Sequence, residues 1–277
     1  MSLDKQYSNI LTKLSIDCSK CCGLCCVALY FSKTDGFPTD KVAGKPCVNL
    51  MSDFRCTIHS RLVECKMKGC LAYDCFGAGQ IVTQSIYKGL DWKSKPEISE
   101  QMFKVFLIVW QLHQMLWYLA EALTLIDDEK IISDINLLII ENEKMTKLSP
   151  EDISNLDIDK YKVKVNQILK DVTKLICTSS NNVANNRKVF DFIGKNFKKQ
   201  NLNGKDFSMA LLIAANLEGC SLHGTNFLGA DLRDVNVKNT DLSKSIFLTQ
   251  GQINSAKGNK NTILPAYLSL PTSWNEL

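Results

Sequence analysis

The sequence of 277 residues lacks the features that define membrane and secreted proteins. It contains no run of roughly 18 apolar residues, the length that a membrane-spanning helix requires. The most hydrophobic stretch, Val105 to Leu119, is interrupted by Gln111 and His113, so it predicts a buried helix. The N-terminal residues Met-Ser-Leu-Asp-Lys-Gln form no apolar core of a secretory signal. We therefore expect a cytoplasmic protein in a reducing compartment, without a membrane partner.

Familiar catalytic motifs and strong charge of one sign are also absent. We find no P-loop, no nucleophile elbow and no dinucleotide-binding fingerprint, so the sequence favours a non-enzymatic role and leaves an enzyme possible. Residues 1–95 hold 13 basic and 8 acidic residues, residues 96–196 hold 12 and 15, and residues 197–277 hold 8 and 6. No segment is a strong polyelectrolyte, and no recognised nucleic-acid module occurs, so we expect no nucleic-acid partner.

Cysteine, in contrast, is abundant and concentrated. Of the 12 cysteines, all but Cys177 and Cys220 lie between Cys18 and Cys75, in a segment rich in Gly, Pro and Asp. Such a density indicates a scaffold held by disulfides or by metal. The expected reducing compartment favours metal, although a disulfide knot stays open. We predict a loop-rich knot here, with short strands at most, for example within Cys26–Phe31.

The cysteine-rich segment supplies eleven candidate metal ligands: Cys18, Cys21, Cys22, Cys25, Cys26, Cys47, Cys56, His59, Cys65, Cys70 and Cys75. Thiolates suit tetrahedral zinc or iron–sulfur clusters, and we favour zinc over iron. The neighbouring side chains of Cys25 and Cys26 diverge, which indicates either two metals or one ligand beside a buried thiol. His59 is a ligand, a base or an ordinary surface histidine on this pattern, and Cys220 occupies a structural position.

Three motifs in this segment resemble the YkgJ-type family of zinc- or iron-chelating cysteine clusters. They are the CxxxCxxCC spacing that ends at Cys25-Cys26, the Gly44-Lys-Pro-Cys47-Val-Asn-Leu50 step, and Cys56-Thr-Ile-His59. The resemblance covers about residues 18–75. It implies metal chelation, and Cys21 is extra to its first motif.

The middle of the chain has helical periodicity. After Pro96-Glu97, large apolar residues recur at three- and four-residue steps through Leu123. Further helices are predicted from Asp127 to about Lys147, after Ser149-Pro150, from Lys160 to Cys177, and briefly from Arg187 to Phe197. We expect the polar run between the last two to be a loop.

A strict five-residue repeat follows. Large apolar residues occupy every fifth position from Leu202 to Phe247, and mostly small residues lie two positions earlier. Ala215-Asn-Leu-Glu-Gly and Ala230-Asp-Leu-Arg-Asp resemble the motif of the pentapeptide-repeat family, which implies a right-handed, quadrilateral β-helix. Gln200 and Lys205 are too long for the small-residue position, so we expect an irregular first coil. The residues after Phe247 predict a helical cap.

These observations predict a mixed fold. We expect a cysteine-rich metal-binding domain at residues 1–95, a helical domain at 96–198, and a pentapeptide-repeat β-solenoid with its cap at 199–277. The chain resembles bacterial proteins named only for these repeats. Our leading hypothesis is a zinc-binding interaction protein with an unidentified protein partner. The alternatives are an iron- or iron–sulfur-dependent redox or tailoring enzyme or maturation factor and, less favoured because residues 200–249 are nearly neutral, a DNA mimic that protects topoisomerases.

Overall fold

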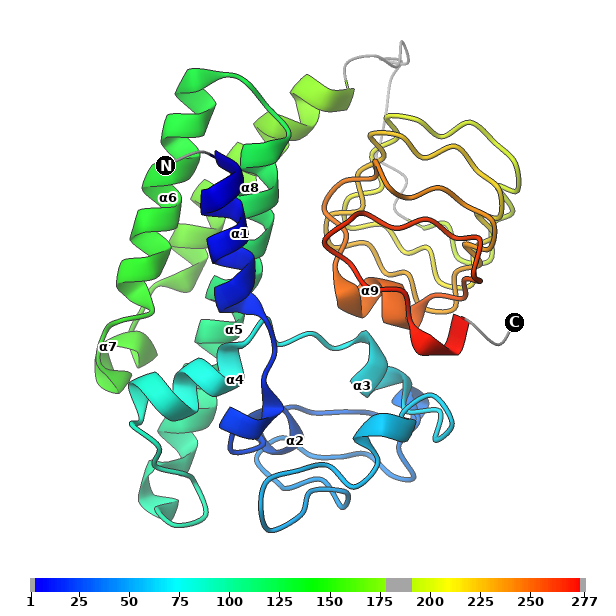
Figure 1. The fold of residues 1–277 in the computed structure, drawn as a ribbon. Coiled ribbons are helices and arrows are strands. Elements are labelled where there is room, and N and C mark those ends of the chain that lie inside the picture. Colours follow the sequence, from blue (N-terminus) through cyan, green and yellow to red (C-terminus); the bar gives the residue numbers. More distant parts are fainter. Residues whose placement is uncertain (1–2, 178–190, 275–277) are drawn as a thin grey trace. The chain divides into compact units, whose positions relative to one another are not determined.

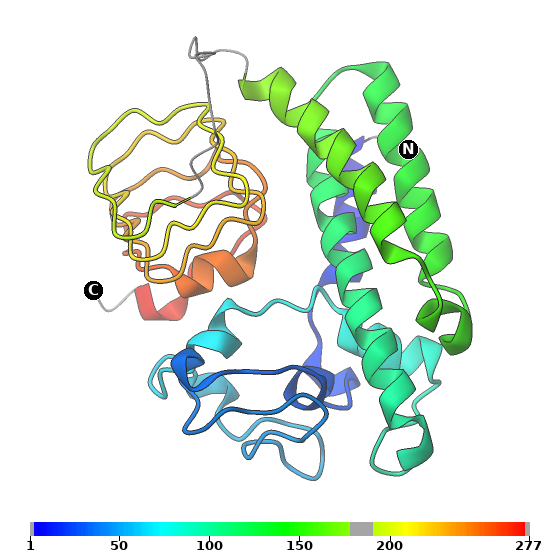
Figure 2. The same cartoon turned by 180° about the vertical axis from the view of Figure 1, so that it is seen from behind.

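The structure, a computed structural model, describes residues 3–177 and 191–274. It divides the chain into two compact units (Figures 1 and 2). The first unit comprises Met1–Gly69 and Cys75–Val172, and the second comprises Cys70–Asp74 and Thr173–Leu277. Within the described ranges, no helix has both the length and the apolar character needed to cross a membrane. The division into three domains at residues 95 and 198 stays a prediction.

A helical bundle dominates the first unit. Its central helix α5 buries a broad apolar face and contacts α1, α6 and α7. The side chain of Asp128 caps α6 by accepting from the Ile131 N–H at 3.0 Å, and Ser149 caps α7. The bundle helices are α1 (Leu3–Leu14), α5 (Ser99–Thr124), α6 (Glu129–Met145), α7 (Pro150–Ser154) and α8 (Ile158–Cys177). Sequence analysis did not predict α1.

A buried polar group joins three helices of this bundle. The side-chain amide of Asn142 in α6 donates to the carbonyl of Leu112 in α5 at 2.9 Å, and to the hydroxyl of Tyr161 in α8 at 3.2 Å. Tyr161 donates in turn to the carbonyl of Leu138 at 2.9 Å. Because apolar contacts alone leave helix register loosely defined, these directional bonds help to fix it.

Short helical turns and loops make up the cysteine-rich part of the same unit. They are η1 (Cys18–Lys20), α2 (Leu24–Ala28), η2 (Lys33–Asp35), η3 (His59–Arg61), α4 (Ala78–Gln80), the π-helical η4 (Ile81–Ile86) and η5 (Pro96–Ile98). Helix α3 (Lys68–Ala72) begins in the first unit and ends in the second, which includes Cys70–Asp74. The expectation of a strand within Cys26–Phe31 was wrong, since α2 occupies its first part. Helix α2 packs on α5, which anchors the cysteine-rich loops to the bundle.

The repeat region of the second unit corrects the predicted fold class. It follows a coiled path in which single residues twenty positions apart pair in parallel, from Asp191 with Leu211 to Asn226 with Ile246 (Figure 1). Each pairing involves one residue, and the described residues contain no β-strand and no sheet. The prediction of a quadrilateral β-helix was therefore wrong.

Backbone conformation explains the missing strands. Residues with positive φ recur at five-residue steps through the repeats, for example Gly194, Lys199 and Gly204. A left-handed residue turns the chain before a second residue can join a ladder. The predicted helix Arg187–Phe197 was also wrong: residues 187–190 lie outside the described ranges, and Asp191 and Asn196 already form bridges. The first coil is regular despite Gln200 and Lys205.

The interior of the coil is filled by the large apolar residue at the centre of each repeat. The central apolar residues from Phe192 to Phe247 are buried. Small polar side chains two positions before them donate to carbonyls of the previous coil, as Thr225 does to Leu202 at 2.9 Å and Cys220 does to Phe197 at 2.9 Å. These bonds satisfy polar atoms that lie away from water.

The C-terminal end of the coil is covered by α9 (Gln250–Ser255) and η6 (Thr272–Trp274). The Gln252 side chain donates to the carbonyls of Phe227 and Ala230 at 2.9 and 2.8 Å. Trp274 is buried, and its indole N–H donates to the Ala256 carbonyl at 3.3 Å.

Candidate metal centre and interaction surface

Four of the predicted ligands meet at one cavity in the first unit. The cavity has a volume of about 30 Å³, and its lining includes Cys18, Cys21, Cys25 and Cys75. Ile16, Asp17, Gly79, Gln80 and Phe106 complete the wall. Cys18 lies in η1 and Cys25 in α2, whereas Cys21 and Cys75 lie in loops, so the fold brings together thiols up to 57 positions apart in sequence.

Two residues that were not among the predicted ligands shape this cavity. The side chain of Gln80 accepts from the Asp17 N–H at 2.5 Å and donates to the Ser15 carbonyl at 3.0 Å, so it holds the segment that leads to Cys18. Gly79 leaves room for the thiol of Cys21, because a Cβ at Gly79 would lie 2.6 Å from that sulfur. The pattern Gly77-Ala-Gly79 is the feature of the sequence that could have signalled this role.

A second group of cysteines lies around Cys26. The Cys47 N–H donates to the Cys26 carbonyl at 2.9 Å, and the bridge between Leu50 and Cys56 brings the next cysteine back toward Cys47. The Cys56 thiol interacts electrostatically with those of Cys26, Cys47 and Cys65. The structure thus places Cys26, Cys47 and Cys56 near one another, and the Cys18 thiol at the cavity also interacts electrostatically with those of Cys26 and Cys56.

The remaining predicted ligands lie elsewhere. Cys22 is buried in the bundle, with its sulfur 3.8 Å from that of Met102, and burial raises its pKa to about 11. Cys70 belongs to the second unit. His59 is exposed at the start of η3. The Cys177 side chain lies outside the described parts of the structure.

Cys26 differs from the neighbouring thiols in its tendency to ionise. Burial raises the pKa of Cys18, Cys21 and Cys56. Cys25 and Cys26 have their sulfurs 3.9 Å apart, and the bond from Cys25 to Cys26 raises the pKa of Cys25 and lowers that of Cys26. The nearby ammonium of Lys41 also lowers the pKa of Cys26.

The donor atoms are gathered but not arranged as a closed coordination shell. Among residues 3–177 and 191–274, no three Cys, His, Asp or Glu side chains are placed to hold a metal ion. The described cysteines form no disulfide. The geometry therefore supplies thiols at the cavity and around Cys26, and ligation would require the side chains to close by rotation around an ion.

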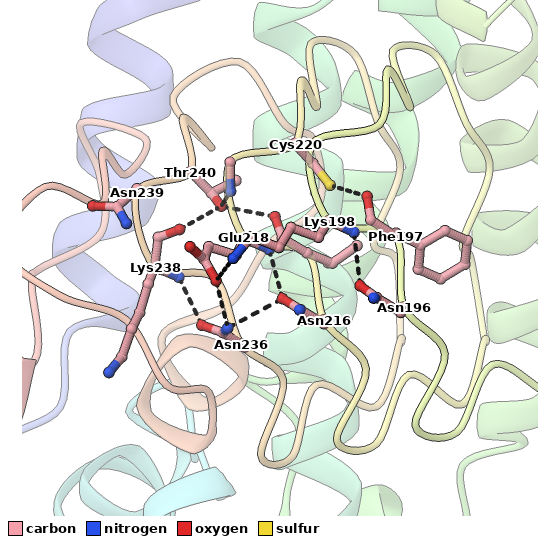
Figure 3. Close-up of polar contacts among 12 residues, drawn as sticks. Asn196, Phe197, Lys198, Asn216, Glu218, Cys220, Asn236, Lys238, Asn239 and Thr240 are labelled. Atoms are coloured by element: carbon pink, nitrogen blue, oxygen red, sulfur yellow. Dashed lines mark hydrogen bonds and ion pairs between the residues drawn. The ribbon is translucent and has the colours of Figure 1, made fainter.

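A lysine- and asparagine-rich side of the coil forms a second candidate site, which we call the lysine face. Its column of bridge residues is Asn196, Asn216, Asn236 and Lys257. The Asn236 amide donates to Asn216 at 3.1 Å, and Lys198 pairs with Glu218 at 3.0 Å (Figure 3). Four lysines and one glutamate belong to this side by their position in the repeats: Lys198, Lys199, Lys238, Lys257 and Glu218.

The lysine face could have been found by reading the repeats with a period of twenty. The neighbouring side of the coil carries Asp191, Asp231 and Asp234 with Arg233, and Asp234 pairs with Lys257 of the lysine face at 2.9 Å, so the charges of the two sides partly compensate each other. The charge totals of whole segments do not show this arrangement, because they add together residues from all sides of the coil. An excess of positive charge on one side steers association with negatively charged surfaces.

Comparison with known proteins supports the repeat assignment. The family model for pentapeptide repeats matches residues 191–227 and 210–247, in eight copies. The chain is also 43% identical over 271 residues to the Uncharacterized protein YybG of Bacillus subtilis (strain 168), and the match covers 97% of each chain. No solved structure matches. The chain belongs to the same family as this Bacillus protein and carries pentapeptide repeats; the YkgJ-type resemblance stays a prediction.

Proposed function

We propose that this protein is a cytoplasmic, zinc-binding interaction protein, in which cysteines of the first unit hold metal and the repeats bind a protein partner. The observation that carries the metal proposal is the cavity shared by Cys18, Cys21, Cys25 and Cys75. Four thiols around one small space match the donor set of structural zinc. Zinc bound in this way would stabilise the loops and would perform no chemistry.

The size of the cavity favours a single ion over a four-iron cluster. A cavity must offer roughly 10–15 Å³ to the centre of a water-sized sphere in order to hold one water molecule. The cavity between the cysteines offers about 30 Å³, which is enough for a single ion. A cluster of iron and inorganic sulfide needs several times that space. The iron–sulfur alternative would therefore require a larger rearrangement of the loops.

Elemental analysis with an absorption spectrum tests the metal. The full chain would be purified without oxygen and without a metal-affinity tag. We expect zinc at stoichiometric level and no visible absorption band. Iron with sulfide and a visible absorption band would favour the iron-dependent redox alternative over the zinc proposal. A chain that neither contains zinc nor binds added Zn²⁺ would overturn the metal proposal.

The partner-binding part of the proposal concerns the lysine face. The four lysines of this face outnumber the two carboxylates that pair with them, Glu218 and Asp234, and so fit an acidic protein surface. The Asn ladder offers amide donors and acceptors between the lysines. A DNA mimic would need the opposite charge on this side. The repeats also hold their side chains on a regular backbone, which lowers the entropy cost of binding.

Affinity capture with matched charge reversals tests the partner. The bait carrying Lys199→Glu and Lys238→Glu is compared with wild type and with Lys205→Glu plus Lys244→Glu, which changes the same total charge on another side of the coil. We expect proteins retained by wild type and by the control to be lost from the first variant. Equal retention by both variants would show that the lysine face is not the binding surface.

A further inference from the structure

We infer that the coil recognises an amphipathic helix of its protein partner, one whose apolar stripe is flanked by acidic residues. This inference rests on the proposed function, because it names the kind of partner that the lysine face takes. The helix would lie where the lysine face meets the first two coils of the neighbouring side, residues 191–194 and 211–214. We call these residues the aliphatic side.

Large aliphatic side chains are exposed on the aliphatic side. Ile193 is 54% exposed and Leu211 is 41% exposed, and the bridge between Asp191 and Leu211 places their two coils next to each other. Met209, just before Leu211 in the chain, is 66% exposed. A Cβ at Gly229 would lie 2.6 Å from the Met209 sulfur, so this side chain lies against the second coil. Apolar side chains that gather on a surface in this way indicate an interaction site.

Leu211 lacks a bond that polar residues of the bridge columns make. Asp and Asn side chains at these positions accept from the N–H two residues later, as Asp231 does from Arg233 at 3.1 Å in the same column. This bond stabilises the turn that follows. Leu211 has no acceptor to offer the Ile213 N–H. The chain thus weakens this turn and exposes aliphatic surface instead, which indicates a role in binding.

Backbone bonding excludes the addition of a β-strand to this side. The Phe192 N–H donates to the Leu211 carbonyl at 2.8 Å. The Leu212 N–H donates in turn to the Asp231 carbonyl at 3.0 Å. Because these groups bond between coils, the aliphatic side presents side chains to a partner and not a strand edge. Recognition of an aliphatic surface through side chains is the mode in which an amphipathic helix binds.

The charges at the border with the lysine face select an acidic helix. Lys195 is exposed at the corner between the two sides, and Lys198 and Lys199 follow it on the lysine face. A helix that covers the aliphatic side would bring the acidic residues on its flank to these ammonium groups. Asp231 pairs with Arg233 at 2.6 Å, which reduces its repulsion of such residues. Complementary charge of this kind fixes the orientation of a partner.

Binding of defined peptides to the full chain tests the inference. The probe is a covalently stapled helical peptide with leucines at three- and four-residue steps and glutamates on the adjoining face. Its controls are a peptide of the same composition in scrambled order and a peptide with lysine in place of glutamate. We expect the acidic amphipathic peptide to bind at least about tenfold more tightly than either control, measured by fluorescence anisotropy.

The peptide controls separate failure of this inference from failure of the proposed function. Equal binding of the amphipathic and scrambled acidic peptides would overturn the inference and leave recognition of acidic partners by the lysine face intact. Absence of binding by both acidic peptides would contradict the partner proposal itself. This comparison uses wild type, so it does not depend on the folding of a variant.

A substitution at Leu211 assigns the binding to the aliphatic side. Leu211→Asn supplies the missing acceptor for the Ile213 N–H, so we expect a melting temperature at or above that of wild type. We also expect about tenfold weaker binding of the acidic amphipathic peptide. Leu137→Asn is the matched control, because Leu137 is 62% exposed on α6 of the first unit, and it should leave binding unchanged. Undiminished binding by Leu211→Asn, or equal weakening in both variants, would overturn the inference.

Discussion

The imidazole of His113 lies with its Nδ1 2.7 Å from the carbonyl oxygen of Phe76. Because a carbonyl can only accept, Nδ1 carries the proton and donates. The bond joins the central helix α5 to the residue directly after Cys75, and thereby holds one wall of the cysteine cavity against the bundle. Burial lowers the pKa of His113 from 6.5 to about 4, so the folded protein keeps this histidine neutral at physiological pH.

The first prediction is a loss of stability in mild acid. The unfolded chain binds a proton at His113 below its ordinary pKa of 6.5, whereas the folded chain resists protonation until about 4. The free energy of unfolding should therefore fall as pH drops through this window, by about 2.5 kcal/mol between about pH 7.5 and about pH 4.5. Urea unfolding at both pH values measures the change.

The control for this prediction separates His113 from all other titrating groups. His113→Gln should remove about that much of the pH dependence, because the glutamine amide does not titrate in this range. Equal pH dependence in wild type and His113→Gln would contradict the assignment of the effect to this residue.

The second prediction concerns the buried polar group of the bundle. Tyr161→Phe removes a hydroxyl that donates to Leu138 and accepts from Asn142, so we expect the free energy of unfolding to fall by about 1–2 kcal/mol. Tyr87→Phe is the matched control, because its hydroxyl bonds to Gln101 in a part-buried position, where water replaces the lost bond. Chemical unfolding of both variants measures the difference, and an equal or larger loss for Tyr87→Phe would contradict it.

The spacing of apolar residues and the capping residues in the sequence predicted the helices that local sequence patterns define. The three- and four-residue spacing through Leu123 matches α5, and Ser149-Pro150 precedes α7 as its cap. Helix α1 was missed because its apolar residues, such as Ile10 and Leu14, are few and become buried only against α5. The β-helix was predicted from a family likeness, while the left-handed residue in each repeat limits every pairing to a single residue.

The sequence predicted which residue types form the candidate site, but it did not predict which of these residues lie together. Ten clustered cysteines indicated metal ligands, but which of them share a cavity depends on tertiary contacts such as those of Gln80 with Asp17 and Ser15. The burial of Cys22 depends on α5, some 80 positions away at Met102. Sequence spacing carries no information about such contacts.

The third prediction addresses the inward polar side chains of the repeats. Thr225→Val keeps the shape of a fully buried residue but removes its bond to the Leu202 carbonyl, and we expect a loss of about 1 kcal/mol in stability. Cys220→Ser should preserve the bond to Phe197 and leave the zinc content unchanged. Thermal unfolding and metal analysis measure both, and a loss of zinc in Cys220→Ser would contradict the structural role of that thiol.

The last prediction concerns the space that Gly79 leaves for Cys21. Gly79→Ala places a methyl group 2.6 Å from the Cys21 sulfur, so this thiol must shift from its place at the cavity. If the cavity binds zinc as proposed, we expect roughly tenfold weaker binding of one ion, equal to about 1.4 kcal/mol. Competition with a chromophoric chelator measures the affinity. Gly69→Ala is the matched control, because its methyl group would meet Phe31 and Asp35 at 2.8 Å, away from the cavity. Equal weakening in both variants would indicate a general loss of folding, whereas weakening in Gly79→Ala alone would link metal affinity to the position of Cys21.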